Sequence, residues 1–117
     1  MSKGYQLIRL ADLIEHYSKE GQERLKNILN YLIKVEKLYE VRENAYLHRN
    51  MIEEAKLKII NYLKEKGSIR AIEFKDLLGV SRDLARDILD YFVAKGITVR
   101  SEGRHRLRIV NNKASDG

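Results

Sequence analysis

The chain has 117 residues, of which 23 are Lys or Arg and 17 are Asp or Glu, and its formal net charge is +6. It contains no cysteine, proline or tryptophan, so disulfide scaffolds and cysteine zinc fingers are excluded. No apolar run approaches the roughly 20 residues of a membrane span, and residues 1–5 lead into no secretory apolar core. We therefore expect a cytoplasmic protein without membrane contacts. The net charge fits either solubility or an anionic partner, and its location decides between them.

An internal repeat divides the chain into two copies of one small module. When the sequence is shifted by 60 positions, Ile-Leu-Asn-Tyr-Leu-Ile at 28–33 aligns with Ile-Leu-Asp-Tyr-Phe-Val at 88–93. The same shift places Tyr46-Leu47-His48 over Arg106-Leu107-Arg108. We therefore predict modules at residues 1–49 and 50–117.

The first module is predicted to be shortened at its start. Its expected elements are helices at 10–17 and 22–35 and a hairpin of strands at 37–41 and 45–48. Only nine residues precede the first of these helices, so we expect that a further helix is missing or reduced and that the chain is a piece of a longer protein. The join to the second module at 49–50 is short, which predicts a rigid pair of modules.

The second module shows the complete order of elements. Apolar residues at 52, 55, 59, 60 and 63 have the spacing of an amphipathic helix, Gly67 ends that helix, and Ser81 is a natural N-cap for a later one. The predicted elements are a helix at 51–66, an extended piece at 68–70, helices at 71–78 and 82–95, and strands at 97–100 and 105–110. The fold class is therefore mainly α with short antiparallel β-hairpins (α+β), as two tandem winged-helix modules.

Positive charge concentrates in the second hairpin, or wing. Between Gly96 and Lys113 five basic residues stand against Glu102 alone, so this stretch supplies +4 of the net charge. The first module provides an internal control. By the shift of 60, it has Glu40, Asn44, Ala45, Tyr46 and His48 where the second has Arg100, Arg104, His105, Arg106 and Arg108. Only the second copy is therefore predicted to have a charged wing.

The helix at 82–95 is neutral, because Arg82, Arg86 and Lys95 are offset by Asp83, Asp87 and Asp90. A helix that enters a DNA major groove is usually basic along its exposed face. Here only the start of the helix, with its free N–H groups, suits a phosphate. Such a patch fits an RNA loop or bulge better than a long duplex. The candidate RNA-binding residues are Ser81, Arg82, Arg100, Arg104, His105, Arg106 and Arg108.

Other interpretations stay open at this stage. Alternating wing arginines also protect an edge strand from aggregation, and Arg86 also suits a helical pair with Asp90. A transcription regulator that binds duplex DNA as a dimer needs a basic helix face and a dimerisation surface, and neither is evident. A pure protein-interaction module would show no salt-dependent affinity for nucleic acid.

Catalytic and metal-binding patterns are missing from the sequence. It has no glycine-rich phosphate loop and no nucleophile elbow, and His16, His48 and His105 lack the spacing of metal ligands. We therefore expect no enzyme activity, metal or cofactor in this chain. Tyr31 and Tyr91 recur at equivalent positions and are predicted to be core or domain-contact residues.

Several linked motifs carry a family resemblance that covers residues 10–110. They are Tyr46-Leu47-His48-Arg49, Ala55-Lys56, Phe-Lys-Asp-Leu-Leu-Gly-Val-Ser-Arg at 74–82, Leu89-Asp90-Tyr91-Phe92 and Thr98-Val99-Arg100. Together they resemble the last two winged-helix modules of the SelB family, bacterial elongation factors specialised for selenocysteine.

The resemblance implies a function. In that family a GTPase body, which uses GTP and Mg and is absent from this chain, carries selenocysteyl-tRNA to the ribosome, while the terminal winged helix grips the selenocysteine insertion hairpin of mRNA. Ser81 and Arg82 match the turn motif, Arg100 matches the first wing strand, and Arg104 or Arg106 matches its basic tip. This chain departs from the family pattern at Asp83, near Arg86 and at Glu102-Gly103, where Lys, Pro and Gly-Asp are usual. We expect a monomer.

Overall fold

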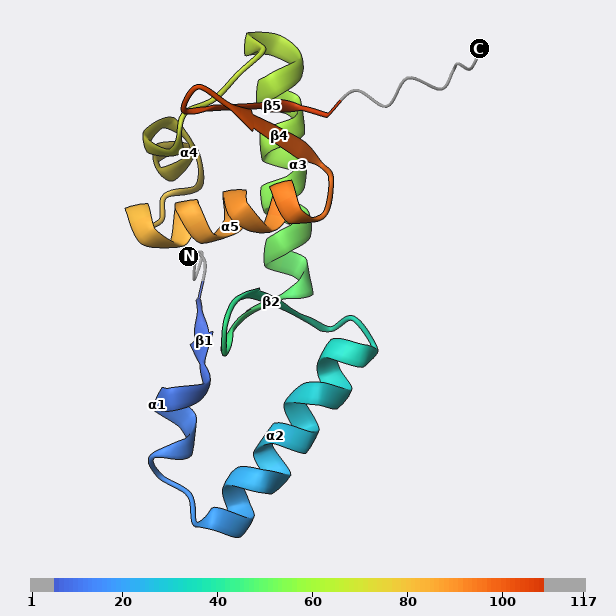
Figure 1. Cartoon of the computed structure of the whole chain (residues 1–117), viewed down its shortest axis with the longest axis vertical. Coiled ribbons are helices and arrows are strands. Elements are labelled where there is room, and N and C mark those ends of the chain that lie inside the picture. Colours follow the sequence, from blue (N-terminus) through green and yellow to red (C-terminus); the bar gives the residue numbers. More distant parts are fainter. Residues whose placement is uncertain (1–5, 109–117) are drawn as a thin grey trace.

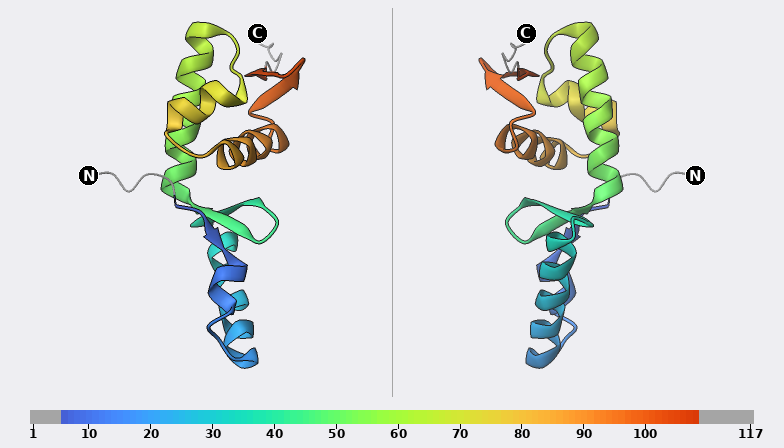
Figure 2. Two further views of the ribbon diagram at one scale, coloured as in Figure 1. Left: turned by 90° about the vertical axis from the view of Figure 1, so that its left-hand side faces the viewer. Right: turned by 90° about the vertical axis from the view of Figure 1, so that its right-hand side faces the viewer.

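The computed structural model describes residues 6–108, which form two groups of helices joined by a β-hairpin (Figures 1 and 2). The predicted order of helices and hairpins is confirmed, and the first helix is shorter than expected. The second wing strand was expected to reach Val110, which lies outside the described residues. The elements are β1 (Ile8–Arg9), α1 (Leu10–Ile14), α2 (Lys19–Lys34), β2 (Leu38–Arg42), β3 (Ala45–His48), α3 (Arg49–Lys66), α4 (Ala71–Leu78), α5 (Arg82–Ala94), β4 (Thr98–Ser101) and β5 (Arg104–Leu107).

Local sequence signals set the ends of the long helices. The hydroxyl of Ser18 accepts a hydrogen bond from the N–H of Gly21 at 3.2 Å, and that of Ser81 accepts one from the N–H of Leu84 at 3.1 Å. These two serines therefore satisfy N–H groups that would otherwise lack partners at the starts of α2 and α5. Gly79, with a φ of 71°, ends α4 in the left-handed conformation that glycine adopts without steric cost.

The repeat is visible in the backbone where α2 and α5 end. The N–H of Lys37 donates to the carbonyl of Leu32 at 2.8 Å, and the N–H of Ile97 donates to the carbonyl of Phe92 at 2.9 Å. Each residue of the second pair stands 60 positions after its counterpart in the first pair, as the sequence shift predicts. The two helices therefore lead into their hairpins through the same turn.

The first hairpin is one residue longer than the second, and this extra residue corrects the alignment of the repeat. Arg100 pairs with His105 in β4–β5, whereas Glu40 pairs with Tyr46 in β2–β3. An irregularity between Glu40 and Arg42 adds one residue to β2, so the shift of 60 becomes 59 beyond it. The first-module counterparts of Arg104, His105, Arg106 and Arg108 are therefore Ala45, Tyr46, Leu47 and Arg49, and not the residues given by a constant shift.

A short third strand borders each hairpin. Ile8 in β1 pairs with Tyr46, and Ile69, between α3 and α4, forms an isolated antiparallel bridge with His105. The N–H of Ile69 donates to the carbonyl of His105 at 3.0 Å, and the reverse bond measures 2.8 Å. Each module therefore has three extended segments side by side, in the order β1-β3-β2 in the first module.

The first hairpin is buried on both faces. The larger hydrophobic cluster, built on α3, α4 and α5 around Ile59, Phe74 and Phe92, also includes Val41 and Leu47 from β2 and β3. The smaller cluster uses the other face of the hairpin and consists of Leu10, Leu29, Leu38 and Tyr46. The hairpin β2–β3 is therefore shared by the two modules, and its outer face cannot serve as a free wing.

Contacts between β2 and α5 hold the modules together. The ring of Tyr39 stacks on that of Tyr91 with 5.9 Å between their centres, and the Nε of Arg42 donates to the Oδ2 of Asp87 at 2.7 Å. Burial, helped by nearby Tyr39 and the carboxylates of Glu53 and Glu36, raises the pKa of Tyr91 to about 12. Tyr91 is therefore a domain-contact residue, as predicted. The prediction for Tyr31 is wrong, because its side chain is 62% exposed.

Candidate nucleic-acid interface

The second wing has two chemically different faces. Residues paired across an antiparallel ladder point to the same side, so Arg100 and His105 share one face with Thr98 and Leu107. This inner face lies toward the core, since Thr98 and His105 are 1% and 5% exposed. The outer face consists of Val99, Ser101, Arg104 and Arg106.

The outer face is the more basic of the two. Arg106 is exposed, Val99 beside it is 39% exposed, and Arg104 is half-buried. The Nη1 of Arg104 donates to the hydroxyl of Ser68 at 3.1 Å, which orients its guanidinium along the surface. Arg108, which follows β5, is exposed and its side chain lies over Gly96. The outer face of the wing therefore presents Arg104 and Arg106, while Arg100 is exposed on the other face.

His105 is removed from the set of candidate RNA contacts. Its side chain is buried in the second module, and Tyr46, its first-module counterpart, is likewise 5% exposed and belongs to the smaller cluster of the first module. The Nδ1 of His105 has no hydrogen-bond partner among the described residues. Burial and the positive charge of Arg100 lower the pKa of His105, and Asp90 opposes this effect. His105 is therefore a buried residue on the inner face of the wing, and its imidazole is neutral at physiological pH.

Burial of His105 predicts acid-sensitive stability. Its pKa is lower in the folded chain than the 6.5 of an exposed histidine, so the unfolded state binds the proton more readily. The stability that the neutral ring contributes is complete above pH 6.5 and falls as the pH drops through the lowered pKa. We expect His105→Tyr, the residue of the first module, to reduce the loss of unfolding free energy between about pH 7.5 and pH 5. Equal losses in the two proteins, measured by urea unfolding, would contradict this role.

The start of α5 is a second, separate part of the candidate interface. Ser81 and Arg82 are both exposed, and Ser81 already uses its hydroxyl to cap the helix. In Figure 1 this helix start and the turn between β4 and β5 lie on the same side of the second module, with α4 near them. The structure thus divides the predicted residues among the outer wing face, the helix start and, for Arg100, the inner wing face.

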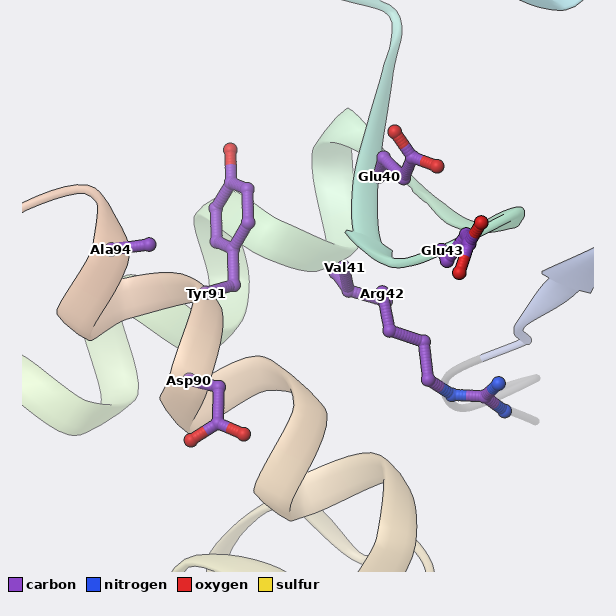
Figure 3. Close-up of a pocket in the computed structure, with 7 residues that line it drawn as sticks. All are labelled: Glu40, Val41, Arg42, Glu43, Asp90, Tyr91 and Ala94. Atoms are coloured by element: carbon purple, nitrogen blue, oxygen red, sulfur yellow. The ribbon is translucent and has the colours of Figure 1, made fainter.

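The first module covers part of the outer side of α5. In Figure 1 the helix lies between the second wing and the hairpin β2–β3. An open pocket of about 400 Å³ remains at this junction, and Figure 3 shows Tyr91 and Asp90 from α5 on one side of it and β2 on the other. Asp87 is held there by Arg42. The charged residues of α5 that stay exposed are Arg82, Asp83, Arg86 and Asp90, so its free face is neutral, whereas a helix in a DNA major groove is usually basic along its exposed face.

Sequence reasoning missed one basic residue beside the wing. Arg70 follows the bridging residue Ile69 and is exposed. The repeat carries a signal for it, because Arg9 follows the equivalent strand residue Ile8 in the first module. That signal becomes readable only when β1 and the segment at 68–70 are recognised as equivalent strands.

Two further features are absent from residues 6–108: a membrane-spanning helix and a metal site. No helix in this range is both long and apolar enough to cross a membrane. No group of three His, Asp or Glu side chains in the same range is arranged to hold a metal ion.

Comparisons with known proteins identify the family. The family model described as "Elongation factor SelB, winged helix" matches residues 61–107. The structure of the mRNA-binding domain of elongation factor SelB from E. coli in complex with SECIS RNA is 30% identical, with a TM-score of 0.76, and the match covers 89% of this chain and 85% of that one. Among curated protein sequences no relative matches.

A second solved structure extends the likeness of fold. The bacterial selenocysteine-specific elongation factor EF-Sec is 24% identical over 89% of this chain, with a TM-score of 0.66. The match covers 16% of the length of that factor, so this chain corresponds to a small part of it. The winged helices, their order and the 30% identity to the SelB domain together show that this chain belongs to the SelB family.

Proposed function

We propose that this chain is the RNA-binding, C-terminal part of a selenocysteine-specific translation elongation factor. It recognises the selenocysteine insertion hairpin of mRNA and thereby recruits the factor, with its selenocysteyl-tRNA, to the ribosome. The E. coli SelB domain that resembles it is described in complex with SECIS RNA. The observation that carries the proposal is the free, basic outer face of the second wing at Arg104 and Arg106.

A comparison of the two hairpins supports this assignment, because their residues differ at the positions that pack on protein in the first module and are free in the second. In the first module Leu47 is fully buried at the junction, whereas its counterpart Arg106 is exposed. Val99 is likewise open, whereas its counterpart Tyr39 stacks on Tyr91. The same structural face is thus apolar where it packs on protein and basic where it is free. An unoccupied basic face suits a phosphate backbone.

Single-stranded and irregular RNA fits this surface better than duplex DNA. The exposed charges of α5 sum to zero and β2 contacts the helix at Asp87 and Tyr91, so this helix lacks the basic face that suits a DNA major groove. What remains is a wing and a helix start, which can contact a loop or a bulged nucleotide whose phosphates are splayed apart. We assign Ser81, Arg82, Arg100, Arg104, Arg106 and Arg108 to this contact surface. His105 supports the wing from inside.

The first module acts as a rigid spacer in this proposal. The chain itself carries no catalytic role and no cofactor; GTP and Mg belong to the GTPase part of the factor. It functions as a monomer in the cytoplasm, without membrane contacts.

A competition experiment tests the proposed function. A library of RNA hairpins with a bulged stem and randomised loops is selected on the purified chain, so that the cognate loop need not be known. We expect the selected hairpin to bind with salt-dependent affinity and to resist displacement by duplex DNA of equal length. Equal displacement by DNA would favour the transcription regulator, and no salt-dependent binding would favour a protein-interaction module.

A further inference from the structure

The third strand of the second module brings another arginine onto the outer wing face. Ile69 is bridged to His105, and an antiparallel arrangement then places Arg70 opposite Arg104 and Ser68 opposite Arg106. Residues opposite each other across such strands have Cβ atoms about 5 Å apart and point to the same side. The hydrogen bond from Arg104 to Ser68 at 3.1 Å confirms that the two segments share this face.

The arginines on this face have no acidic partner within residues 6–108. Among residues 6–108, none of the ion pairs includes Arg70, Arg104 or Arg106. The nearby carboxylate of Glu73 accepts a hydrogen bond from the backbone N–H of Arg70 at 2.9 Å and so stabilises the start of α4. Like charges directly opposite each other on a sheet are destabilising. A cluster that costs stability in the free chain is therefore best explained by an anion that binds it.

The equivalent position in the first module has no such cluster. Arg9 in β1 pairs with Ala45, the counterpart of Arg104. Leu47, the counterpart of Arg106, is buried. An arginine after the third strand thus occurs in both modules, but Arg9 lies opposite an alanine, whereas Arg70 lies opposite an arginine. This difference follows from the corrected register and gives a control residue in the same structural position.

We infer that Arg70 is a further RNA-binding residue, which forms with Arg104 and Arg106 one phosphate-binding strip across two neighbouring extended segments. This inference rests on the proposed RNA binding. Guanidinium groups bind phosphate oxygens through paired N–H donors, so adjacent arginines suit successive phosphates of one strand. Arg100 stands outside this strip, because it lies on the opposite face of the wing.

Binding of the selected RNA hairpin to Arg70→Ala, Arg9→Ala and Arg104→Ala variants tests the inference. Each variant is measured by fluorescence anisotropy at several salt concentrations. We expect Arg70→Ala to weaken binding about tenfold and to reduce the salt slope by roughly 0.7–0.9, as loss of one phosphate contact does. Arg9→Ala should bind as the unchanged protein does, and Arg70→Lys should keep the salt slope because it keeps the charge.

The outcomes separate this inference from the proposed function. If Arg104→Ala weakens binding and Arg70→Ala does not, the assignment of Arg70 is wrong and RNA binding by the wing stands. If Arg9→Ala weakens binding as much as Arg70→Ala, the loss of affinity follows from the lower net charge alone, and the assignment of Arg70 to the phosphate-binding strip is again wrong. If the unchanged chain binds no hairpin, the proposed function fails and the inference fails with it. Thermal unfolding of each variant verifies that its fold is retained.

Discussion

Phe92→Ala should unfold the second module under conditions in which the unchanged chain stays folded. Phe92 is fully buried, and its ring packs on the edge of Phe74 with 6.3 Å between their centres. Replacing a buried phenylalanine with alanine costs about 3–5 kcal/mol, because packing is lost and a cavity remains. That loss is a large part of the roughly 5–15 kcal/mol by which small domains are stable. Urea unfolding followed by circular dichroism measures the change.

Tyr31→Ala is the matched control for the aromatic truncation. Tyr31 occupies a helix of the same type in the first module, but its side chain is largely exposed. We expect Tyr31→Ala to change the free energy of unfolding by about 0.5 kcal/mol or less, as other surface substitutions do. A comparable loss in the two variants would show that Tyr31 is covered in solution and that the core described around Phe92 is not the main source of stability.

Arg82→Ala combined with Arg104→Ala should abolish most of the affinity for the RNA hairpin. The two arginines lie at the start of α5 and on the outer wing face, so the double variant weakens both parts of the proposed interface. Each charged hydrogen bond contributes about 1.5–3 kcal/mol, and the combined loss is on the order of a hundredfold or more in affinity. Anisotropy titration at fixed salt measures it. Unchanged binding would end the RNA-binding proposal for this surface.

The control for that double variant removes the same charge elsewhere. Arg24 and Lys26 are exposed on α2 in the first module, away from the wing (Figure 1). Their replacement with alanine lowers the net charge by the same two units. If binding depends only on net charge, both double variants will lose similar affinity. If the wing and helix start make directed contacts, the α2 variant will lose much less.

Much of the fold could be read from the sequence because local signals agree with the tertiary structure. The spacing of apolar residues in α3, the cap at Ser81 and the stop at Gly67 each report on backbone that lies close in sequence. The repeat then linked the two modules. These signals predict the winged helices and the charged second wing without information about contacts between distant residues.

The register of the wings could not be predicted in the same way. The extra residue at Val41 in β2 leaves no mark in the alignment of the repeat, yet it changes which residues correspond beyond it. Side chains alternate between faces, so a shift by one residue decides whether a position is buried or free. For this reason His105 could not be separated from its exposed arginine neighbours by composition alone.

Tyr31 and Tyr91 show a second limit. They are identical residues at equivalent places in the repeat, but only Tyr91 has a preceding hairpin that supplies a stacking partner, Tyr39. Their different burial depends on what the rest of the chain places beside each helix. The spacing of apolar residues in a helix predicts which positions face the core of its own module. It carries no information about which positions a neighbouring module covers.

The chain has no linker where the two modules meet: β3 ends at His48 and α3 begins at Arg49. Because the hairpin before this point is packed on both sides, the modules cannot turn independently without breaking core contacts. The two modules therefore move together as one rigid body. A small change in the angle at which the wing holds its ligand therefore becomes a larger displacement of the far ends of α1 and α2.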